Sequence, residues 1–162
     1  MSTEFKDSLG RSWTVSVDFA AAKRVRGAVK VTNEEGEEQP FDLIDAGNIG
    51  LTMSALRSKY LAVGETLYQI IKPQADSKGI TEEQFLEGCV GDALDDAAKV
   101  IEDELILFFP KSLREVVKLM FEKSEQIRTQ ALAGAGKNLE AVTLEQMEVF
   151  GQQATKPQAS SV

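Results

Sequence analysis

Histidine is absent from the sequence, and Cys89 is the only cysteine among its 162 residues. A disulfide within the chain is therefore excluded, and so is a zinc site built from histidine and cysteine ligands. Cysteine nucleophiles activated by histidine and histidine proton shuttles are excluded for the same reason. We interpret Cys89 as a small packed apolar residue. The sequence predicts a protein that is not an enzyme, with no catalytic residue, no metal site and no cofactor.

Long apolar runs and positive charge are also scarce. No apolar run approaches the ~20 residues that span a bilayer, and the first residues, "MSTEFKDSLG", lack the basic and apolar regions of a signal peptide. With 18 basic and 26 acidic residues, the net charge is −8. This charge disfavours nucleic acid and anionic membranes as partners and favours basic ones. Because a lone cysteine is typical of a reducing compartment, we expect a cytoplasmic protein.

The composition, 43% apolar and 27% charged, is that of a globular domain. Near the start, Trp13, Val15 and Val17 alternate with polar residues, which predicts a strand with one buried face. The preceding turn signal "DSLG" extends this to a β-hairpin over about residues 3–17. Asp18 is then the expected N-cap of a helix that ends near Lys30. Its expected inner face is Phe19, Ala22, Val25 and Val29.

The middle of the chain is punctuated by proline and by polar turns. The segment "NEEGEEQP" predicts a solvated loop, and "FDLIDAGNIG" a short apolar turn or helical piece. Residues 51–71 predict one long helix that Pro73 ends. A turn "PQADSKG" follows, and Thr81 with Gln84 predicts a capping box that starts a short helix over about 82–88. The core-facing stripe expected on the long helix is Met53, Leu56, Tyr60, Val63, Leu67 and Ile70.

Two further helices are expected after residue 91. Asp92 is the expected cap of a helix over 93–109 that Pro110 ends, and Ser112 with Glu115 predicts a capping box for a helix over 113–133. The expected inner stripes are Leu94, Ala97, Ile101, Leu105 and Phe108 on the first, and Leu113, Val116, Met120, Ser124 and Ile127 on the second. On the outside of the first helix we expect Asp95, Asp96, Glu102 and Asp103.

These patterns predict an α+β fold that is mainly α. We expect an N-terminal β-hairpin followed by a compact bundle of about four to five helices, all in one globular domain over residues 1–133. The sequence "GAGKN" is expected to break the last helix. Residues 134–162 are expected to form a linker, with or without a short helix over 139–150, and a flexible, disordered tail.

Two features resemble ligand sites without completing them. "GAGK" at 134–137 lacks the rest of a phosphate loop because Asn138 follows the lysine. The carboxylates of residues 92–104 lack the spacing of a calcium loop. They form either a solvated helix face or a surface for a basic partner, and they comprise Asp92, Asp95, Asp96, Glu102, Asp103 and Glu104.

Two sets of residues are candidates for partner binding. The basic set on the first helix is either a solvated face that pairs with the acidic loop 34–38 or a protein-binding face. The apolar set around Pro110 is either a helix corner in the core or an exposed groove for a partner helix. The candidates are Lys23, Arg24, Arg26 and Lys30 in the basic set, and Phe108, Phe109, Met120 and Phe121 in the apolar set.

The order of these features is similar to that in a family of small prophage and tailed-phage proteins, the tail assembly chaperones of siphovirus-like phages. The resemblance covers about residues 10–125 and is strongest in "KPQADSKGITEEQF", "GDAL" and "FFP". These segments are turns and caps. The chain departs from the family by the acidic insertion "NEEGEEQP" and by its extension past Ala133.

The resemblance implies a non-enzymatic protein in the cytoplasm of a bacterial host. Such a chaperone binds and solubilises the tape measure protein during tail morphogenesis and is displaced before the virion is complete. Self-association is left open. The alternative is a structural virion component, either a minor tail protein or a head–tail joining protein.

Overall fold

The computed structural model describes residues 3–140, and it confirms the mainly helical α+β class. The described residues form six α-helices, two antiparallel β-hairpins and one short 3₁₀ helix. Contacts along the chain divide it into two units, Met1–Glu122 and Lys123–Val162. The division falls earlier than the boundary after residue 133 that the sequence predicts.

The N-terminal hairpin forms as predicted. Strand β1 (Thr3–Lys6) pairs with β2 (Ser12–Val15) in a register that places Phe5 opposite Trp13. Both of these side chains and Val15 are buried. The alternation of apolar and polar residues therefore identified the face of the hairpin that enters the core.

Helix α1 (Phe19–Ala28) begins at the predicted cap, because the Asp18 carboxylate accepts a hydrogen bond from the Ala21 amide at 2.7 Å. Its buried residues are Ala21, Ala22 and Val25. The placement of Phe19 on the inner face was wrong, since 70% of this residue is exposed. The Phe19 ring instead lies edge-on against Phe108, with centroids 5.2 Å apart.

The acidic segment after α1 is not a simple loop, because it forms the turn and the second strand of another hairpin. Strand β3 (Lys30–Thr32) pairs with β4 (Glu38–Pro40). Helix α1 stops early because Val29 and Val31 are β-branched, buried and separated by one exposed residue, a strand pattern. At the turn, the Asn33 side chain accepts hydrogen bonds from the amides of Glu35 and Glu37.

The long helix predicted over 51–71 is two helices. After η1 (Ala46–Asn48) come α2 (Ile49–Ser58) and α3 (Tyr60–Ser77), separated at Lys59. Near the break, the Ser58 hydroxyl donates to the Ser54 carbonyl, a contact that bends helices. Tyr60 is consequently 44% exposed instead of packed in the core. Leu56, Val63, Leu67 and Ile70 are buried as predicted, and Met53 is partly buried.

Pro73 lies inside α3 and does not end it, contrary to the sequence-based prediction. A proline within a helix leaves the carbonyl four residues earlier, here that of Gln69, without its donor. The Arg24 guanidinium of α1 donates to this carbonyl through Nε at 2.8 Å and to the Ile70 carbonyl through Nη2 at 3.2 Å. Arg24 thus supplies the donor that the proline lacks, and α3 continues to Ser77.

The end of α3 also covers the outer edge of β2. The Gln74 side chain accepts from the Thr14 amide at 3.0 Å and donates to the Thr14 carbonyl at 2.5 Å. The Lys78 ammonium donates to the Ser12 carbonyl at 3.3 Å and lies 4.4 Å from the centre of the Trp13 ring. Side chains of α3 therefore occupy hydrogen-bonding positions that another strand would take.

Helix α4 (Glu82–Leu86) begins with the predicted capping box between Thr81 and Gln84. Helix α5 (Asp92–Phe108) is capped by Gly91, so Asp92 is its first residue instead of its cap. It ends just before Phe109, as Pro110 predicts.

The predicted inner residues of α5 are buried or partly buried, but two of its glutamates are buried as well. The prediction that Glu102 lies outside was wrong. Its carboxylate is 2.7 Å from the Arg57 guanidinium of α2. Glu104 accepts a hydrogen bond from the Thr3 hydroxyl of β1 at 2.7 Å. Burial of both acids is offset by these bonds.

Helix α6 (Lys111–Glu140) crosses the division between the two units. It begins one residue before Ser112, which therefore lies in its first turn and is not the predicted cap. Gly134 and Gly136 are inside the helix, since glycine weakens a helix by about 1 kcal/mol relative to alanine without ending it. Most of the short helix predicted over 139–150 and the rest of the predicted tail lie outside the described residues.

The predicted inner stripe of α6 was wrong for three of its five residues, since only Met120 and Ser124 are partly buried. Leu113, Val116 and Ile127 are exposed, while Val117 and Phe121 are buried. Both sets have helical spacing, and only one of them faces the core of the first unit.

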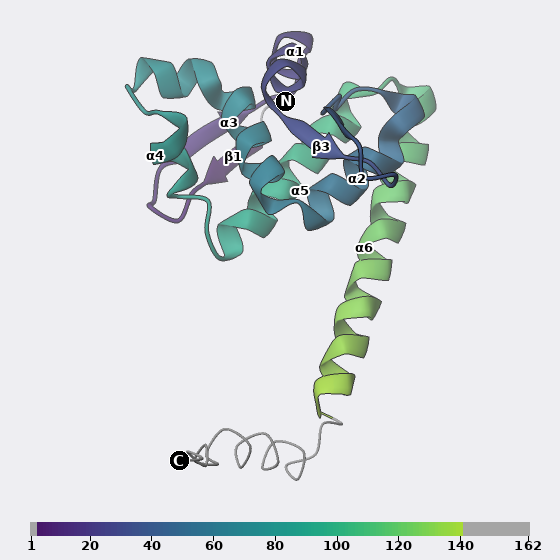
Figure 1. The fold of residues 1–162 in the computed structure, drawn as a ribbon. Coiled ribbons are helices and arrows are strands. Elements are labelled where there is room, and N and C mark those ends of the chain that lie inside the picture. Colours follow the sequence, from purple (N-terminus) through teal and green to yellow (C-terminus); the bar gives the residue numbers. More distant parts are fainter. Residues whose placement is uncertain (1–2, 141–162) are drawn as a thin grey trace, which may run out of the picture. The chain divides into compact units, whose positions relative to one another are not determined.

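Helix α3 is the central element of the first unit (Figure 1). It contacts α1, α2, α4 and α5 as well as strand β2, and β1 packs on α5. The core of the unit is formed where these elements meet, around Trp13, Leu67, Ile71, Phe85 and Ile101.

The bond between Arg24 and Gln69 predicts a specific loss of stability. Replacing Arg24 with glutamine should lower the free energy of unfolding by about 1–2 kcal/mol, because a partly buried carbonyl loses its donor. Urea denaturation measures this change. The control is Arg26→Gln, which should cost less than about 0.5 kcal/mol because its ion pair with Asp42 is exposed and 4.0 Å long.

A Pro73→Ala background separates this explanation from a general packing effect. Alanine restores a backbone N–H that can donate to the Gln69 carbonyl. Arg24→Gln should therefore cost less than half as much in this background. An equal cost in both backgrounds would show that Arg24 does not compensate for the proline.

Candidate protein-binding surface

The corner between α5 and α6 is fixed by proline and arginine. Pro110 lacks an N–H, and the carbonyls at the end of α5 need donors from elsewhere. The Arg114 guanidinium of α6 donates to the Leu107 carbonyl at 3.1 Å and to the Phe109 carbonyl at 3.3 Å. The sharp turn is therefore held by side chain–backbone bonds across the corner.

Apolar side chains gather around this corner without being buried. Phe19 contacts the end of α5 through Phe108, and Leu107 lies beside Phe108 in the sequence. On α6, Leu113, Val116 and Leu119 are 39%, 54% and 52% exposed. We call the following set the corner patch, by its place at the end of α5 and the start of α6 and, for Phe19, by its contact with Phe108: Phe19, Leu107, Phe108, Leu113, Val116 and Met120.

The predicted apolar set divides between this patch and the core. Phe109 and Phe121 are buried, with 3% and 0% exposure, so they form the core side of the corner. Phe108 and Met120 are partly buried and remain available at the surface. Sequence periodicity missed the exposed members because it placed Leu113 and Val116 on the inner face.

The predicted basic set does not form one surface. Lys23 is exposed on α1, but Arg24 is bonded to carbonyls of α3. Arg26 lies 4.0 Å from Asp42, and Lys30 lies beyond the helix on β3. Partner binding by these residues stays a prediction, and for Arg24 the structure gives a different role within the fold.

A buried carboxylate lies under the N-terminal hairpin turn. The side chain of Asp7 has no exposed surface. It accepts hydrogen bonds from the Arg11 guanidinium at 2.6 Å and from the Trp13 indole at 3.0 Å, as well as from the backbone. Gly88 fits closely against this pair, since a Cβ there would lie 2.8 Å from Arg11 Nη2. Arg11 also donates to the carbonyls of Gln84 and Phe85, so the cluster joins the hairpin to α4.

The pKa values in this cluster follow from burial and hydrogen bonding. Burial alone would raise the pKa of Asp7, but the bonds from Trp13 and Arg11 outweigh it and hold the pKa below its ordinary value of 3.8. Burial, reinforced by the charge of Asp7, raises the pKa of the Cys89 thiol to about 11. Cys89 is therefore a protonated, packed side chain near neutral pH, a poor nucleophile.

The acidic residues give no metal site in the part of the chain that the structure describes, where no group of three or more potential ligands converges. At the α3–α4 side, Glu65 has its pKa raised, first by burial and then by the charge of Glu82. Among residues 3–140, no helix has the length and apolar character needed to cross a membrane.

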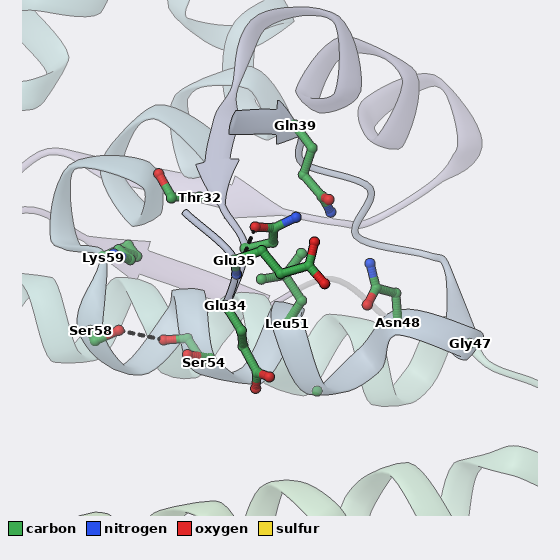
Figure 2. A pocket seen from close by; sticks show the side chains of 12 residues that line it. Thr32, Glu34, Glu35, Gln39, Gly47, Asn48, Leu51, Ser54, Ser58 and Lys59 are labelled. Carbon is green, nitrogen blue, oxygen red and sulfur yellow. Dashed lines mark hydrogen bonds between the residues drawn. The ribbon is translucent and has the colours of Figure 1, made fainter. Parts of the chain in front are cut away.

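A polar cleft of about 650 Å³ lies between the β3–β4 turn and α2. Figure 2 shows Glu34 and Glu35 reaching from the hairpin turn toward α2, which carries Leu51 and Ser54. Sequence reasoning did not find this cleft because it assigned the acidic segment to a solvated loop. The missed signal was the alternation of Val29 and Val31 with polar residues.

No protein-family model matches the sequence, and no curated protein or solved structure is significantly similar to it.

The Asp7 cluster predicts a pH-dependent contribution to stability. Asp7→Asn should lower the free energy of unfolding by about 2 kcal/mol at neutral pH, because it removes charge-assisted hydrogen bonds. The folded-state pKa lies below the ordinary value of 3.8. The difference in free energy of unfolding between wild type and variant should thus have its full value above pH 3.8. It should shrink as the pH falls through the folded-state pKa. Denaturant titrations across this range measure it.

The matched control is Asp76→Asn, whose carboxylate is exposed and pairs with Lys72. It should change the free energy of unfolding by less than about 0.5 kcal/mol. A pH-independent cost of Asp7→Asn would contradict the assignment of the effect to the carboxylate charge.

Cys89 should react slowly with a thiol reagent in the folded chain. Its pKa of about 11 lies above the ordinary value of 9.0. At pH 8 we expect its rate of modification to be at least about a hundredfold lower than in urea, since two pKa units reduce the thiolate fraction by that factor. Absorbance after addition of a disulfide reagent gives both rates. Equal rates would show that the thiol is accessible and ionised.

Proposed function

We propose that the chain is a non-enzymatic phage tail assembly chaperone that binds and solubilises the tape measure protein in the cytoplasm of the bacterial host. The observation that supports this proposal is the corner patch. It offers Phe19, Leu113 and Val116 at the surface, together with the partly buried Phe108 and Met120. An amphipathic helix packs its apolar stripe on a surface of this kind.

The rigidity of the corner suits this role. Phe19 and Phe108 pack edge-on, and Arg114 bonds to the Leu107 and Phe109 carbonyls at the turn. Apolar side chains that are already ordered lose little conformational entropy when a partner binds. A helix of the tape measure protein would therefore find a preformed surface.

The charge of the chain suits a solubilising protein. A complex coated with copies that each carry a net charge of −8 would repel other complexes and stay in solution. Several copies on one long chain would also gain from multivalency, so each contact can be weak. In this proposal the corner patch binds the partner, and the net negative charge of the chain keeps the complex in solution.

Exposed apolar residues elsewhere provide a matched test of the patch. Leu113→Ser with Val116→Ser removes apolar surface from the corner patch. Leu9→Ser with Val90→Ser removes it at positions outside the patch that are 60% and 55% exposed. Neither pair should change the melting temperature by more than a few degrees, because all four side chains are exposed.

Co-expression with the tape measure protein of the same phage or prophage measures the activity. The wild-type chain and the Leu9/Val90 variant should both increase the soluble fraction of the tape measure protein. The Leu113/Val116 variant should lose most of that increase, through an affinity reduced about tenfold or more.

An equally insoluble tape measure protein with and without the chain would overturn the proposal. Mass spectrometry of purified virions tests the structural alternative. Stoichiometric amounts of the chain in virions would identify a minor tail or head–tail joining protein instead.

A further inference from the structure

The second hairpin has one edge whose hydrogen-bonding groups are open. Antiparallel strands alternate between residue pairs that exchange hydrogen bonds and pairs that do not. In this hairpin the Phe41 amide donates to the Val29 carbonyl, and the Asn33 amide donates to the Glu37 carbonyl, each at 2.9 Å. Residues 29, 31 and 33 therefore belong to the pairs that exchange hydrogen bonds with the other strand of the hairpin.

The backbone groups of Lys30 and Thr32 consequently point away from β4. Their partners in the register, Pro40 and Glu38, are the non-bonded pairs. Apart from bonds within the β3–β4 pair, none of the backbone hydrogen bonds found within residues 3–140 involves the amide or carbonyl of Lys30 or Thr32. Both residues are exposed, so the outer edge of β3 presents two donors and two acceptors.

Side chains or a proline occupy several positions on other strand edges of the described chain. On the first hairpin, the outward groups of Thr14 are bonded to the Gln74 side chain, and the outward carbonyl of Ser12 to Lys78. On β4, Pro40 has no N–H to offer at the edge. The edge of β3 has neither feature, and its residues line two clefts.

Two clefts lie along this open edge. The polar cleft of about 650 Å³ and a second one of about 290 Å³ are both lined by Thr32 and Lys59. The second cleft also includes Lys30 and the exposed side chains of Tyr60 and Leu61 at the start of α3. A groove thus follows β3, with the strand on one side and the α2–α3 break on the other.

The two ends of the groove have different chemistry. Tyr60 and Leu61 provide apolar surface at one end. Glu34 and Glu35 provide two carboxylates at the other, where Figure 2 shows Glu35 near Gln39 and Asn48 and Glu34 extending toward Ser54. A bound segment would gain from an apolar residue at the first end and from a basic residue at the second.

We propose that an extended segment of a partner polypeptide binds along β3 as a third strand of this sheet. The segment carries an apolar side chain that packs on Tyr60 and Leu61 and a lysine or arginine that pairs with Glu34 and Glu35. Its backbone bonds to the outward groups of Lys30 and Thr32, a mode of recognition in which main-chain bonds give affinity and side chains give specificity.

A basic partner segment fits this edge better than a second copy of the chain. Two copies would each bring a net charge of −8, which opposes their association. A basic segment is instead attracted, both by the net charge and by the glutamates at the end of the groove. This proposal is independent of the corner patch and of the chaperone function.

A displayed library of random ten-residue peptides, selected on the full chain, tests the proposal. Enriched peptides should carry a lysine or arginine a few residues from an apolar residue. Thr32→Pro should abolish their binding, because it removes an outward N–H that makes no bond in the free protein. The control is Thr32→Ala, which keeps that N–H and should leave binding unchanged.

Charge reversal tests the acidic end of the groove with a second matched pair. Glu34→Lys with Glu35→Lys should weaken binding of an enriched peptide about tenfold or more. Glu37→Lys with Glu38→Lys makes the same change in net charge at exposed residues that do not line either cleft, and it should have a much smaller effect. Fluorescence anisotropy gives the dissociation constants, and amide shifts in NMR spectra should map to Lys30 and Thr32.

Several results would overturn the proposal. They are a library from which nothing is enriched, enrichment that survives Thr32→Pro in a folded variant, and amide shifts confined to the corner patch. A chain that is dimeric in solution and becomes monomeric with Thr32→Pro would show that a second copy occupies the edge instead.

Discussion

Guanidinium groups bonded to backbone carbonyls are the interaction on which the first unit depends. A helix that bends or ends inside a protein leaves carbonyls without donors, and burying them unpaired is costly. Arg24 donates to the carbonyl that Pro73 leaves open on α3, Arg114 to the end of α5, and Arg11 to the end of α4. Each arginine comes from a different element than the helix it caps. These bonds therefore hold elements together while they satisfy the backbone.

This use of arginine also shapes the surface. Arg24 directs its charge toward carbonyls of α3, and Arg57 is paired with the buried Glu102. The charges of these two arginines are therefore directed at groups within the fold, in a chain whose net charge is −8. This net charge favours basic segments as partners, and the contacts that we propose at the corner patch and at the edge of β3 would add apolar and main-chain interactions.

Local patterns predicted the elements that local interactions determine. The first hairpin follows from alternation, and the caps at Asp18 and Thr81 need only residues three positions apart. The remaining features depend on residues distant in the sequence. Pro73 stays helical because of α1, and Glu102 is buried because α2 supplies Arg57. For the candidate surface, periodicity located the corner but could not tell which of two apolar faces of α6 is covered, since this depends on the elements that pack there.

The contact between Gln74 and β2 has a consequence for folding. The amide of a glutamine side chain carries the same donor and acceptor as a peptide group, and here it meets both groups of Thr14. Strand residues point their backbone groups alternately to the two sides. A slip of β2 by one residue would turn the Thr14 groups inward and leave the Gln74 amide facing the wrong position. A single side chain of α3 thus helps to select the register in which the first two strands pair.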